Sequence, residues 1–186
     1  MRDFDPLDYM ERKEARRADR FAQFAVATAS QALADAKLEI TKDLAPRVGV
    51  AFGSGIGGVS TVVENVLSHA KDPRRVSAFM IPMMIIDMAA GEIAMKFGAK
   101  GPNMGHVSAC ASSAHAIGEA SEIIRRGQAD VMIAGGSEAA IHEAVVGGFS
   151  SMKALSTRND DPPGASRPFD TGRDGFVMGE AGAVLV

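Results

Sequence analysis

The feature that most constrains this chain is a short run that reads as a strand, followed by a tight turn of small residues and a helical pattern. The turn lies within residues 105–114 and holds Cys110, the single cysteine of the sequence. Apolar residues then recur at helical spacing, which predicts a helix over residues 111–126. Residues 130–134 are apolar after Asp130 and are expected to form a strand buried on both faces. The pattern therefore places the cysteine at the start of a helix.

A cysteine at this position can be a nucleophile. Spare N–H groups and the dipole at a helix N-terminus favour the thiolate over the thiol. The neighbours Ala109, Ala111, Ser112 and Ser113 are small, so the backbone can bend sharply and a substrate can approach. Free cysteine is also among the most often buried residue types, so position alone leaves a structural role for Cys110 open.

Longer motifs carry a family resemblance. Ser-Ala-Cys-Ala-Ser-Ser-Ala-His at residues 108–115, followed by residues 127–138, resembles the active-site region of the β-ketoacyl-[acyl-carrier-protein] synthases. These are the condensing enzymes of fatty-acid synthesis, and the elongating type II synthase is the most similar type. The resemblance runs from about residue 8 to residue 186. Further matching blocks occur in the family's order at residues 147–149, 154–159, 166–170 and 173–180.

The resemblance implies an α/β fold of the thiolase-like kind: a layered αβα unit with a mixed sheet and the nucleophile helix at its centre. It also implies a single β-ketoacyl synthase N-terminal domain over residues 1–186, shortened at both ends relative to the family. The family's second half carries two histidines and a lysine used in decarboxylation. We therefore expect an incomplete fold and a fragment that can at best be acylated.

Site residues follow from the same resemblance. Cys110 is the expected catalytic nucleophile, and its backbone N–H is one expected oxyanion-hole donor. Ile56 is expected to gate the inner end of the acyl pocket, and Phe176 to lie close to Cys110. The other expected acyl-binding residues are Met80, Ile85 and Phe149. The expected carrier-docking residues are Lys13, Arg16, Arg17, Arg74, Arg75 and Lys153.

Plainer interpretations stay open for some of these residues. The charged residues 12–17 would also suit a solvated helix face, and the methionines at 80–88 would also suit an irregular core. Arg167, Asp170, Arg173 and Asp174 are expected to form a structural ion-pair network near the site.

The activity that the resemblance implies is a decarboxylative Claisen condensation. Cys110 takes an acyl group from acyl-carrier protein, and malonyl-carrier protein then gives a 3-oxoacyl product that elongates a fatty acid. The expected partners are loaded carrier protein and a second copy of the chain, paired through a strand at residues 105–109. Two alternatives stay open: within the enzyme class, a polyketide ketosynthase or a related initiating synthase, and outside it, a noncatalytic partner subunit of the chain-length-factor type. The latter usually lacks the nucleophile, so Cys110 counts against it.

Composition restricts other functions. A formal net charge of −3 gives no support for general nucleic-acid binding. A single cysteine excludes an internal disulfide, which suits a reducing compartment, and no apolar run reaches the roughly 18 residues of a membrane span. We therefore expect a cytoplasmic protein with no membrane span. The glycine-rich residues 53–58 match a dinucleotide fingerprint poorly, and His142-Glu143 lacks a third ligand at metal-like spacing. We therefore expect no cofactor and no metal.

Helices are further expected over residues 19–38 and 59–70, and from Pro82 to about residue 97, with a strand over residues 47–52. Residues 1–19 are charged and are expected to be poorly packed.

Overall fold

The computed structural model describes residues 3–186; residues 1 and 2, which open the charged N-terminal stretch, lie outside the described part. A four-stranded mixed sheet forms its centre, in the order β2-β1-β3-β4. Strand β1 runs parallel to both β2 and β3, and β4 runs antiparallel to β3. The expected mixed sheet is thus confirmed. The strands are β1 (Val48–Gly53), β2 (Asn103–His106), β3 (Val131–Glu138) and β4 (Ala181–Leu185).

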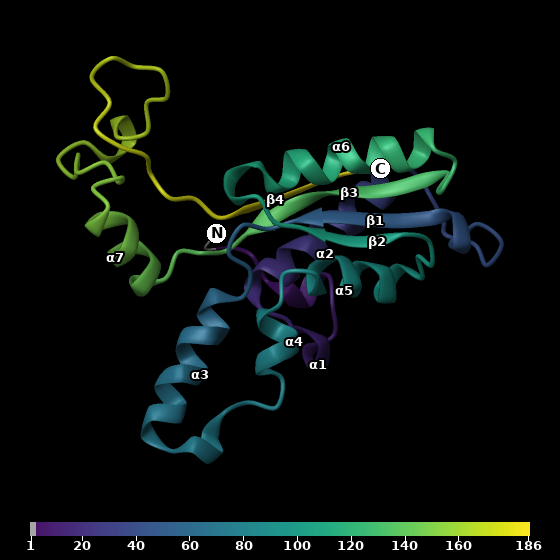
Figure 1. Cartoon of the computed structure of the whole chain (residues 1–186), viewed down its shortest axis with the longest axis horizontal. Helices are drawn as coiled ribbons and strands as arrows, with labels where there is room; N and C mark the ends of the chain where they lie inside the picture. The colour runs from purple at the N-terminus through teal and green to yellow at the C-terminus, as the bar shows by residue number, and fades with distance from the viewer. Residues whose placement is uncertain (1–2) are drawn as a thin grey trace.

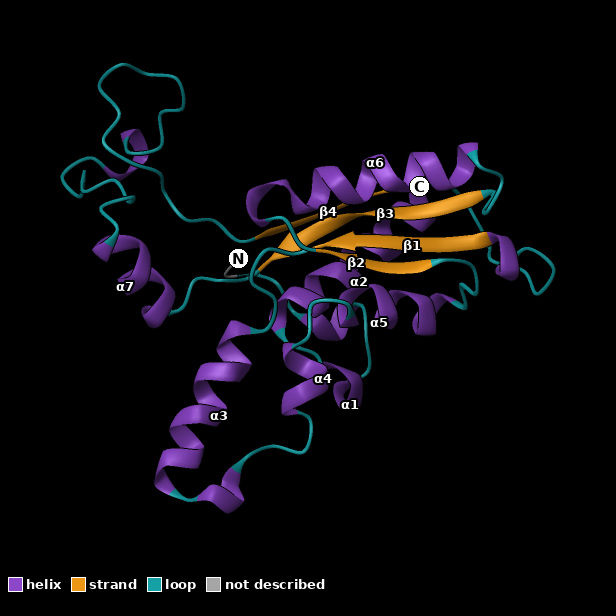
Figure 2. Ribbon diagram, viewed as in Figure 1, coloured by secondary structure: helices purple, strands orange, loops and turns teal. Residues whose placement is uncertain are grey.

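Helices cover both faces of this sheet and give three layers (Figures 1 and 2). Helix α6 (Ser112–Arg125) packs on β1, β2 and β3. The opposite face carries α2 (Arg20–Asp35) and α5 (Met88–Phe97), which pack on each other as well as on the strands. The helices expected over residues 19–38 and 111–126 are confirmed as α2 and α6.

The core lies mainly between the sheet and α2. Every residue of β1 is buried, as a parallel strand covered on both faces should be. Phe21 and Phe24 project from α2 and are fully buried against this face, with Ile93 of α5 beside them in the same cluster. Burying an aromatic or large aliphatic side chain contributes roughly 1.5–3 kcal/mol, so α2 is held mainly by its apolar face.

Three helices extend beyond the layered unit (Figure 1). Helix α3 (Val59–Lys71) and the short α4 (Met80–Met84) form one projection, and α7 (Glu143–Ser151) begins another. The first projection is anchored by Asp19, whose buried carboxylate accepts hydrogen bonds from the Thr61 hydroxyl (2.5 Å) and backbone N–H (3.2 Å). The remaining short helices are η1 (Pro6–Asp8), α1 (Arg12–Ala15), η2 (Ala45–Arg47), η3 (Pro73–Arg75), η4 (Ala109–Ala111) and η5 (Pro162–Gly164).

The single helix expected from Pro82 to residue 97 is wrong. Pro82 lies inside α4, which ends at Met84 because Ile85 adopts an extended conformation (φ −72°, ψ 135°). A separate helix, α5, then starts at Met88 and lies along the sheet. The break lets the chain turn from the projection formed by α3 and α4 onto β1 and β2. Apolar composition does not predict this change of direction, because the change depends on tertiary packing.

The expectation of a poorly packed N-terminal stretch is also wrong for part of it. Met10 and Ala18 are 5% and 3% exposed. The Phe4 ring packs edge-on against Phe24 and stacks on Tyr9. Aromatic side chains among the charges therefore attach this stretch to α2.

Two strands have different bounds from those expected. The strand expected at residues 105–109 lies at residues 103–106, because the backbone leaves the extended conformation at Ser108 (ψ 46°) and Ala109 has a left-handed conformation. The strand expected at residues 130–134 continues to Glu138. Its last four residues are two glycines, a serine and a glutamate, so no apolar pattern predicts the extension. Within residues 3–186, no helix is both long and apolar enough to cross a membrane.

Candidate active site

Three parallel strands bring the candidate site together at one edge of the sheet. The carboxyl ends of parallel strands meet at the same edge, where α/β proteins commonly bind ligands. Residues 54–57 follow β1, and we call this segment the glycine loop. Cys110 follows β2, and Glu138 is the last residue of β3. The sheet topology therefore places Cys110 beside two segments that are distant in sequence.

The backbone turns sharply at the cysteine. Ala109 has a φ of +50°, a conformation that costs energy for any residue except glycine and that concentrates at functional sites. Ser112 holds this turn, because its buried hydroxyl accepts a hydrogen bond from the Ser108 N–H (2.9 Å) and donates one to the Ala109 carbonyl (2.7 Å). Cys110 is left exposed on the turn, just before the first residue of α6.

Helix α6 begins unusually close to the sheet. A Cβ atom on Gly53 would lie 2.4 Å from the Ser112 carbonyl carbon and 2.6 Å from the Ser113 nitrogen. These distances are below any real contact, so only glycine fits at the end of β1. The close approach fixes the start of α6, and with it Cys110, relative to the strand ends.

A cavity of about 740 Å³ opens beside Cys110. The glycine loop, the cysteine turn, the end of β3 and the start of β4 form its walls, together with side chains from α7 and from residues 176–179. Its size falls within the range of small-molecule pockets. A thiol on an exposed turn at such a cavity can attack an electrophilic carbon of a bound ligand.

The structure gathers four of the six predicted catalytic and acyl-binding residues. Cys110, Ile56, Phe149 and Phe176 all line this cavity. The rings of Phe149 and Phe176 meet edge to face with centroids 5.2 Å apart, forming one apolar wall. Met80 and Ile85 lie outside this lining, on α4 and directly after it, and their acyl-binding role stays a prediction.

The predicted docking residues lie on three segments. Lys13, Arg16 and Arg17 lie on α1 and directly after it, and all three are exposed. The Arg17 guanidinium lies 4.4 Å from the centroid of the Phe79 ring, which places α1 beside the projection that ends in α4. Arg74 and Arg75 are exposed on η3, and Lys153 is exposed after α7.

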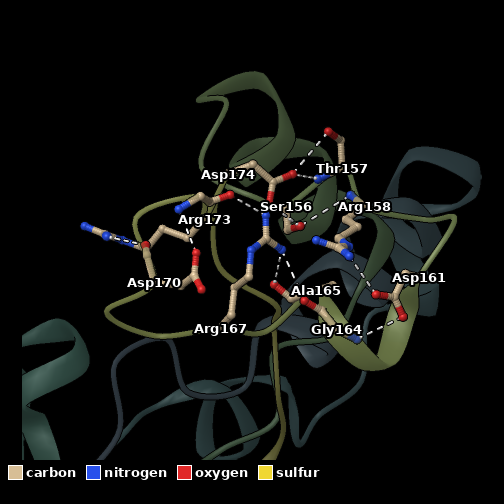
Figure 3. A network of polar contacts seen from close by, with 11 residues as sticks. Ser156, Thr157, Arg158, Asp161, Gly164, Ala165, Arg167, Asp170, Arg173 and Asp174 are labelled. Atoms are coloured by element: carbon tan, nitrogen blue, oxygen red, sulfur yellow. Dashed lines mark hydrogen bonds and ion pairs between the residues drawn. The ribbon is translucent and has the colours of Figure 1, made fainter.

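The predicted polar network is present, with fewer ion pairs than expected (Figure 3). Arg167 pairs with Asp174 (3.2 Å), whereas Arg173 donates to the Asp170 backbone carbonyl (2.8 Å). Hydrogen bonds from the Ser156 hydroxyl and the Thr157 N–H lower the pKa of Asp174 to about 2.

This network positions one wall of the cavity. Phe176 follows Asp174 by two residues, and its backbone exchanges two hydrogen bonds of 3.0 Å, with Ala154 and Ser156. The network therefore ties residues 154–157 to the segment that carries Phe176. The expectation that these charges are structural and close to the site is confirmed for Arg167 and Asp174.

Sequence reasoning missed two residues. Ser112 was expected to serve through its small size, whereas the structure gives its hydroxyl the two hydrogen bonds that hold the turn. Glu138 was not singled out, although its carboxylate accepts hydrogen bonds from the glycine loop. The sequence signal for Glu138 was its position as a charged residue at the end of a buried strand.

His142, considered above as a metal ligand, caps α7 instead, with its Nδ1 accepting from the Ala144 N–H at 3.2 Å. Among residues 3–186, no group of three or more His, Cys, Asp or Glu side chains is arranged to hold a metal ion.

Solved structures define the class of protein to which this arrangement belongs. A β-ketoacyl synthase from Burkholderia phymatum superposes with a TM-score of 0.83 at 34% identity, over 98% of this chain and 45% of that one. A ketosynthase of a type II polyketide system, solved with its acyl-carrier protein and a bound hexaketide, superposes with a TM-score of 0.85 at 32% identity. That match covers 89% of this chain and 42% of the other. The fold is therefore the thiolase-like fold of the ketosynthases.

The family follows from the sequence comparisons. The family model described as "Beta-ketoacyl synthase, N-terminal domain" matches residues 1–186. A 3-oxoacyl-[acyl-carrier-protein] synthase 2 from Staphylococcus aureus is 50% identical over 187 aligned residues, which cover this whole chain and 46% of the relative. This chain belongs to the β-ketoacyl synthase family. It spans about half the length of the curated relatives that it matches.

Proposed function

We propose that the protein carrying this chain is a 3-oxoacyl-[acyl-carrier-protein] synthase that elongates fatty acids, with Cys110 as its nucleophile. The observation that carries this proposal is the exposed Cys110 on a strained turn at the wall of a 740 Å³ cavity. The 50% identity to a synthase of that name supports the reaction class.

In the first step, the Cys110 thiolate attacks the carbonyl carbon of an acyl thioester on the carrier protein. A new carbon–sulfur bond forms, the bond to the carrier sulfur breaks, and the carrier leaves as a thiolate, while the acyl group remains on Cys110 as a thioester. The Cys110 N–H is one proposed donor to the oxyanion, because it lies next to the reacting sulfur. The apolar wall of Phe149 and Phe176 and the side chain of Ile56 are proposed to contact the acyl chain.

In the second step, malonyl-carrier protein loses carbon dioxide, and the electrons of the broken carbon–carbon bond form a carbanion. The carbanion attacks the Cys110 thioester, the cysteine thiolate leaves, and a 3-oxoacyl thioester is released. The family resemblance assigns the groups that promote decarboxylation to sequence beyond the length that this chain spans. The proposed part of residues 1–186 is therefore the acyl-transfer half of the reaction, within an N-terminal domain.

The carrier protein is the proposed macromolecular partner, and the cytoplasm the proposed location. Lys13, Arg16 and Arg17 are exposed on one segment and would attract an acidic partner, as Arg74, Arg75 and Lys153 would elsewhere on the surface. A second copy of the chain is a proposed partner through β2. That strand lies at the edge of the sheet, and an edge strand offers its backbone groups to another strand.

A polyketide ketosynthase is the second candidate. The structural match to a ketosynthase solved with a bound hexaketide favours it. The two activities differ in their products, a fatty-acyl chain in one case and a polyketide chain in the other. A noncatalytic partner subunit fits less well, because this chain retains Cys110.

Acylation of Cys110 is the direct test of the proposal. The protein is incubated with hexanoyl-carrier protein, and its intact mass is then measured, followed by that of its peptides. We expect one hexanoyl group on the peptide containing Cys110 and none in the Cys110→Ser variant treated in the same way. An unmodified Cys110, or equal labelling of the variant at another residue, would contradict the proposal.

A further inference from the structure

Glu138 directs both of its carboxylate oxygens at the glycine loop. Its Oε2 accepts from the Gly55 N–H at 2.7 Å and from the Ile56 N–H at 3.2 Å. Its Oε1 accepts from the Ser54 hydroxyl at 3.0 Å and shares the Ile56 N–H at 3.3 Å. One charged side chain therefore binds three consecutive residues of this loop.

The Ser54 hydroxyl extends this network to the end of the loop. While donating to Glu138, it accepts the Gly57 N–H at 3.1 Å, and the Ser54 N–H donates to the His106 carbonyl at 3.2 Å. All four N–H groups of the glycine loop thus have acceptors. Three of the four depend on Glu138, either directly or through Ser54.

The opposite side of the loop is also confined. Gly57 has a φ of +66°, and a Cβ there would lie 2.6 Å from the Ile86 side chain and 3.1 Å from the Met84 carbonyl. The loop is therefore held between Glu138 on one side and the connection from α4 to α5 on the other. Loss of Glu138 would therefore leave the loop supported on one side only.

The hydrogen bonds of Glu138 argue against a role in proton transfer. An ionised carboxylate has about four acceptor positions, and four contacts from the loop already reach its two oxygens. Although Glu138 lines the Cys110 cavity, its acceptor capacity is used by the loop. What the carboxylate controls is the position of Ile56, whose side chain lines the same cavity.

We infer that Glu138 is a positioning residue that holds the glycine loop and so fixes Ile56, which sets the length of acyl chain that the Cys110 cavity accepts. This inference rests on the proposed acyl transfer to Cys110.

Three variants separate this role from a general loss of structure. Glu138→Ala removes every acceptor at once. Glu138→Gln keeps an amide oxygen for the Gly55 and Ile56 N–H groups, while its NH2 group donates to the Ser54 oxygen. Ile56→Ala removes the side chain that the loop is proposed to place. Glu143→Ala is the matched control, because Glu143 is an exposed glutamate five residues further along the chain.

The experiment measures acyl transfer to Cys110 from carrier-protein thioesters of four to sixteen carbons, and alkylation of Cys110 by iodoacetamide. We expect Glu138→Ala to change the relative rates among chain lengths by about fivefold or more, in the same direction as Ile56→Ala. Glu138→Gln and Glu143→Ala should keep the wild-type profile within about twofold. Iodoacetamide is small, so its rate should change by less than about twofold in every variant.

Two results would overturn the inference. One is a wild-type chain-length profile in Glu138→Ala. The other is an equal loss of rate in that variant at all chain lengths and toward iodoacetamide, which would indicate disruption of the whole site.

Hydrogen exchange at the Gly55 and Ile56 amides tests the positioning separately from the chemistry. Exchange should be about tenfold faster in Glu138→Ala and nearly unchanged in Glu138→Gln. If the wild-type protein takes no acyl group, the proposed function fails, and the length-selecting role of Glu138 fails with it. Unchanged exchange in Glu138→Ala would instead refute the positioning role, whatever the acyl transfer result.

Discussion

At the scale of single residues, the site depends on contacts that only one residue type permits. Gly53 allows the start of α6 to touch the end of β1, and the Ser112 hydroxyl then joins both sides of the cysteine turn. The exposed position of Cys110 is therefore a consequence of packing at least as much as of the local sequence around the cysteine.

Replacing Gly53 with alanine tests this dependence. The added methyl group would overlap the backbone of Ser112 and Ser113, so α6 must move. We expect the free energy of unfolding to fall by about 1–3 kcal/mol, as for other overpacked cores. We also expect slower alkylation of Cys110 by iodoacetamide. Urea unfolding and a thiol-labelling time course measure the two effects.

Gly118→Ala is the control, because it lies within α6 and a Cβ there would meet nothing within 4 Å. Alanine in a helix interior is favoured over glycine by about 0.5–1 kcal/mol, so this variant should be more stable and label normally. If both variants behave alike, the close contact at Gly53 does not position the cysteine.

The sequence predicts the nucleophile better than it predicts the residues that position the segments around it. Cys110 is unique in the chain and lies at a recognisable strand-to-helix turn. Glu138 ends a strand whose apolar part is short, and its partners are more than 80 positions away in sequence. Only the parallel arrangement of β1 and β3 brings them together, and no local pattern encodes that pairing.

At the scale of elements, α1 and α5 enclose an unusual carboxyl group. Glu92 of α5 lines a cavity of about 260 Å³ with Glu14, Arg17 and Lys96. Burial, together with the nearby Glu14 carboxylate, raises the pKa of Glu92 to about 7, although Lys96 opposes this shift. Lys96 also pairs with Glu14 at 3.3 Å, so its positive charge is shared between Glu14 and Glu92.

The raised pKa predicts a pH-dependent stability. The folded state binds the Glu92 proton more tightly than the unfolded state, whose value is near 4.5. This contribution is therefore fully present below pH 4.5 and is lost as the pH rises to about 7. Glu92→Gln should be more stable than the wild type by about 1–2 kcal/mol at pH 8, after allowance for solvent screening. At pH 5 the two proteins should differ little.

Urea unfolding at pH 5 and pH 8 measures the difference. Glu119→Gln is the control, since Glu119 is a half-buried glutamate on α6 that pairs with Arg126 at 3.3 Å. A stability gain of Glu92→Gln that is the same at both pH values would contradict the raised pKa, as would no gain at pH 8.

Element prediction succeeded where periodicity reports burial directly. Helices α2, α3 and α6 and strand β1 follow apolar patterns that the sequence displays. The break between α4 and α5 was missed, because an apolar run continues through Ile85 while the backbone changes direction. The direction of α5 is set by packing against β1, which is distant in sequence, and against β2, which follows α5 along the chain.

At the scale of the whole molecule, the layered unit supplies the inner walls of the cavity, and the segments that extend beyond it complete the outer wall. The nucleophile and the glycine loop come from the sheet edge, whereas Phe149 and Phe176 come from the segments beyond β3. The family resemblance predicted this fold class, and the structural matches confirm it. The polar network around Asp174 positions the outer wall of the cavity. The residue types predicted the ion pair of Asp174 with Arg167 but not its hydrogen bond from Ser156.

We propose that an acyl chain on Cys110 lies in this cavity. The most direct measurement is a crystal structure of the protein alkylated with a long-chain iodoacetamide such as N-dodecyl iodoacetamide. We predict a thioether on Cys110, with the alkyl chain between Ile56 and the paired rings of Phe149 and Phe176. An alkyl chain that lies on the outer surface, or a label on a residue other than Cys110, would contradict this account of the site.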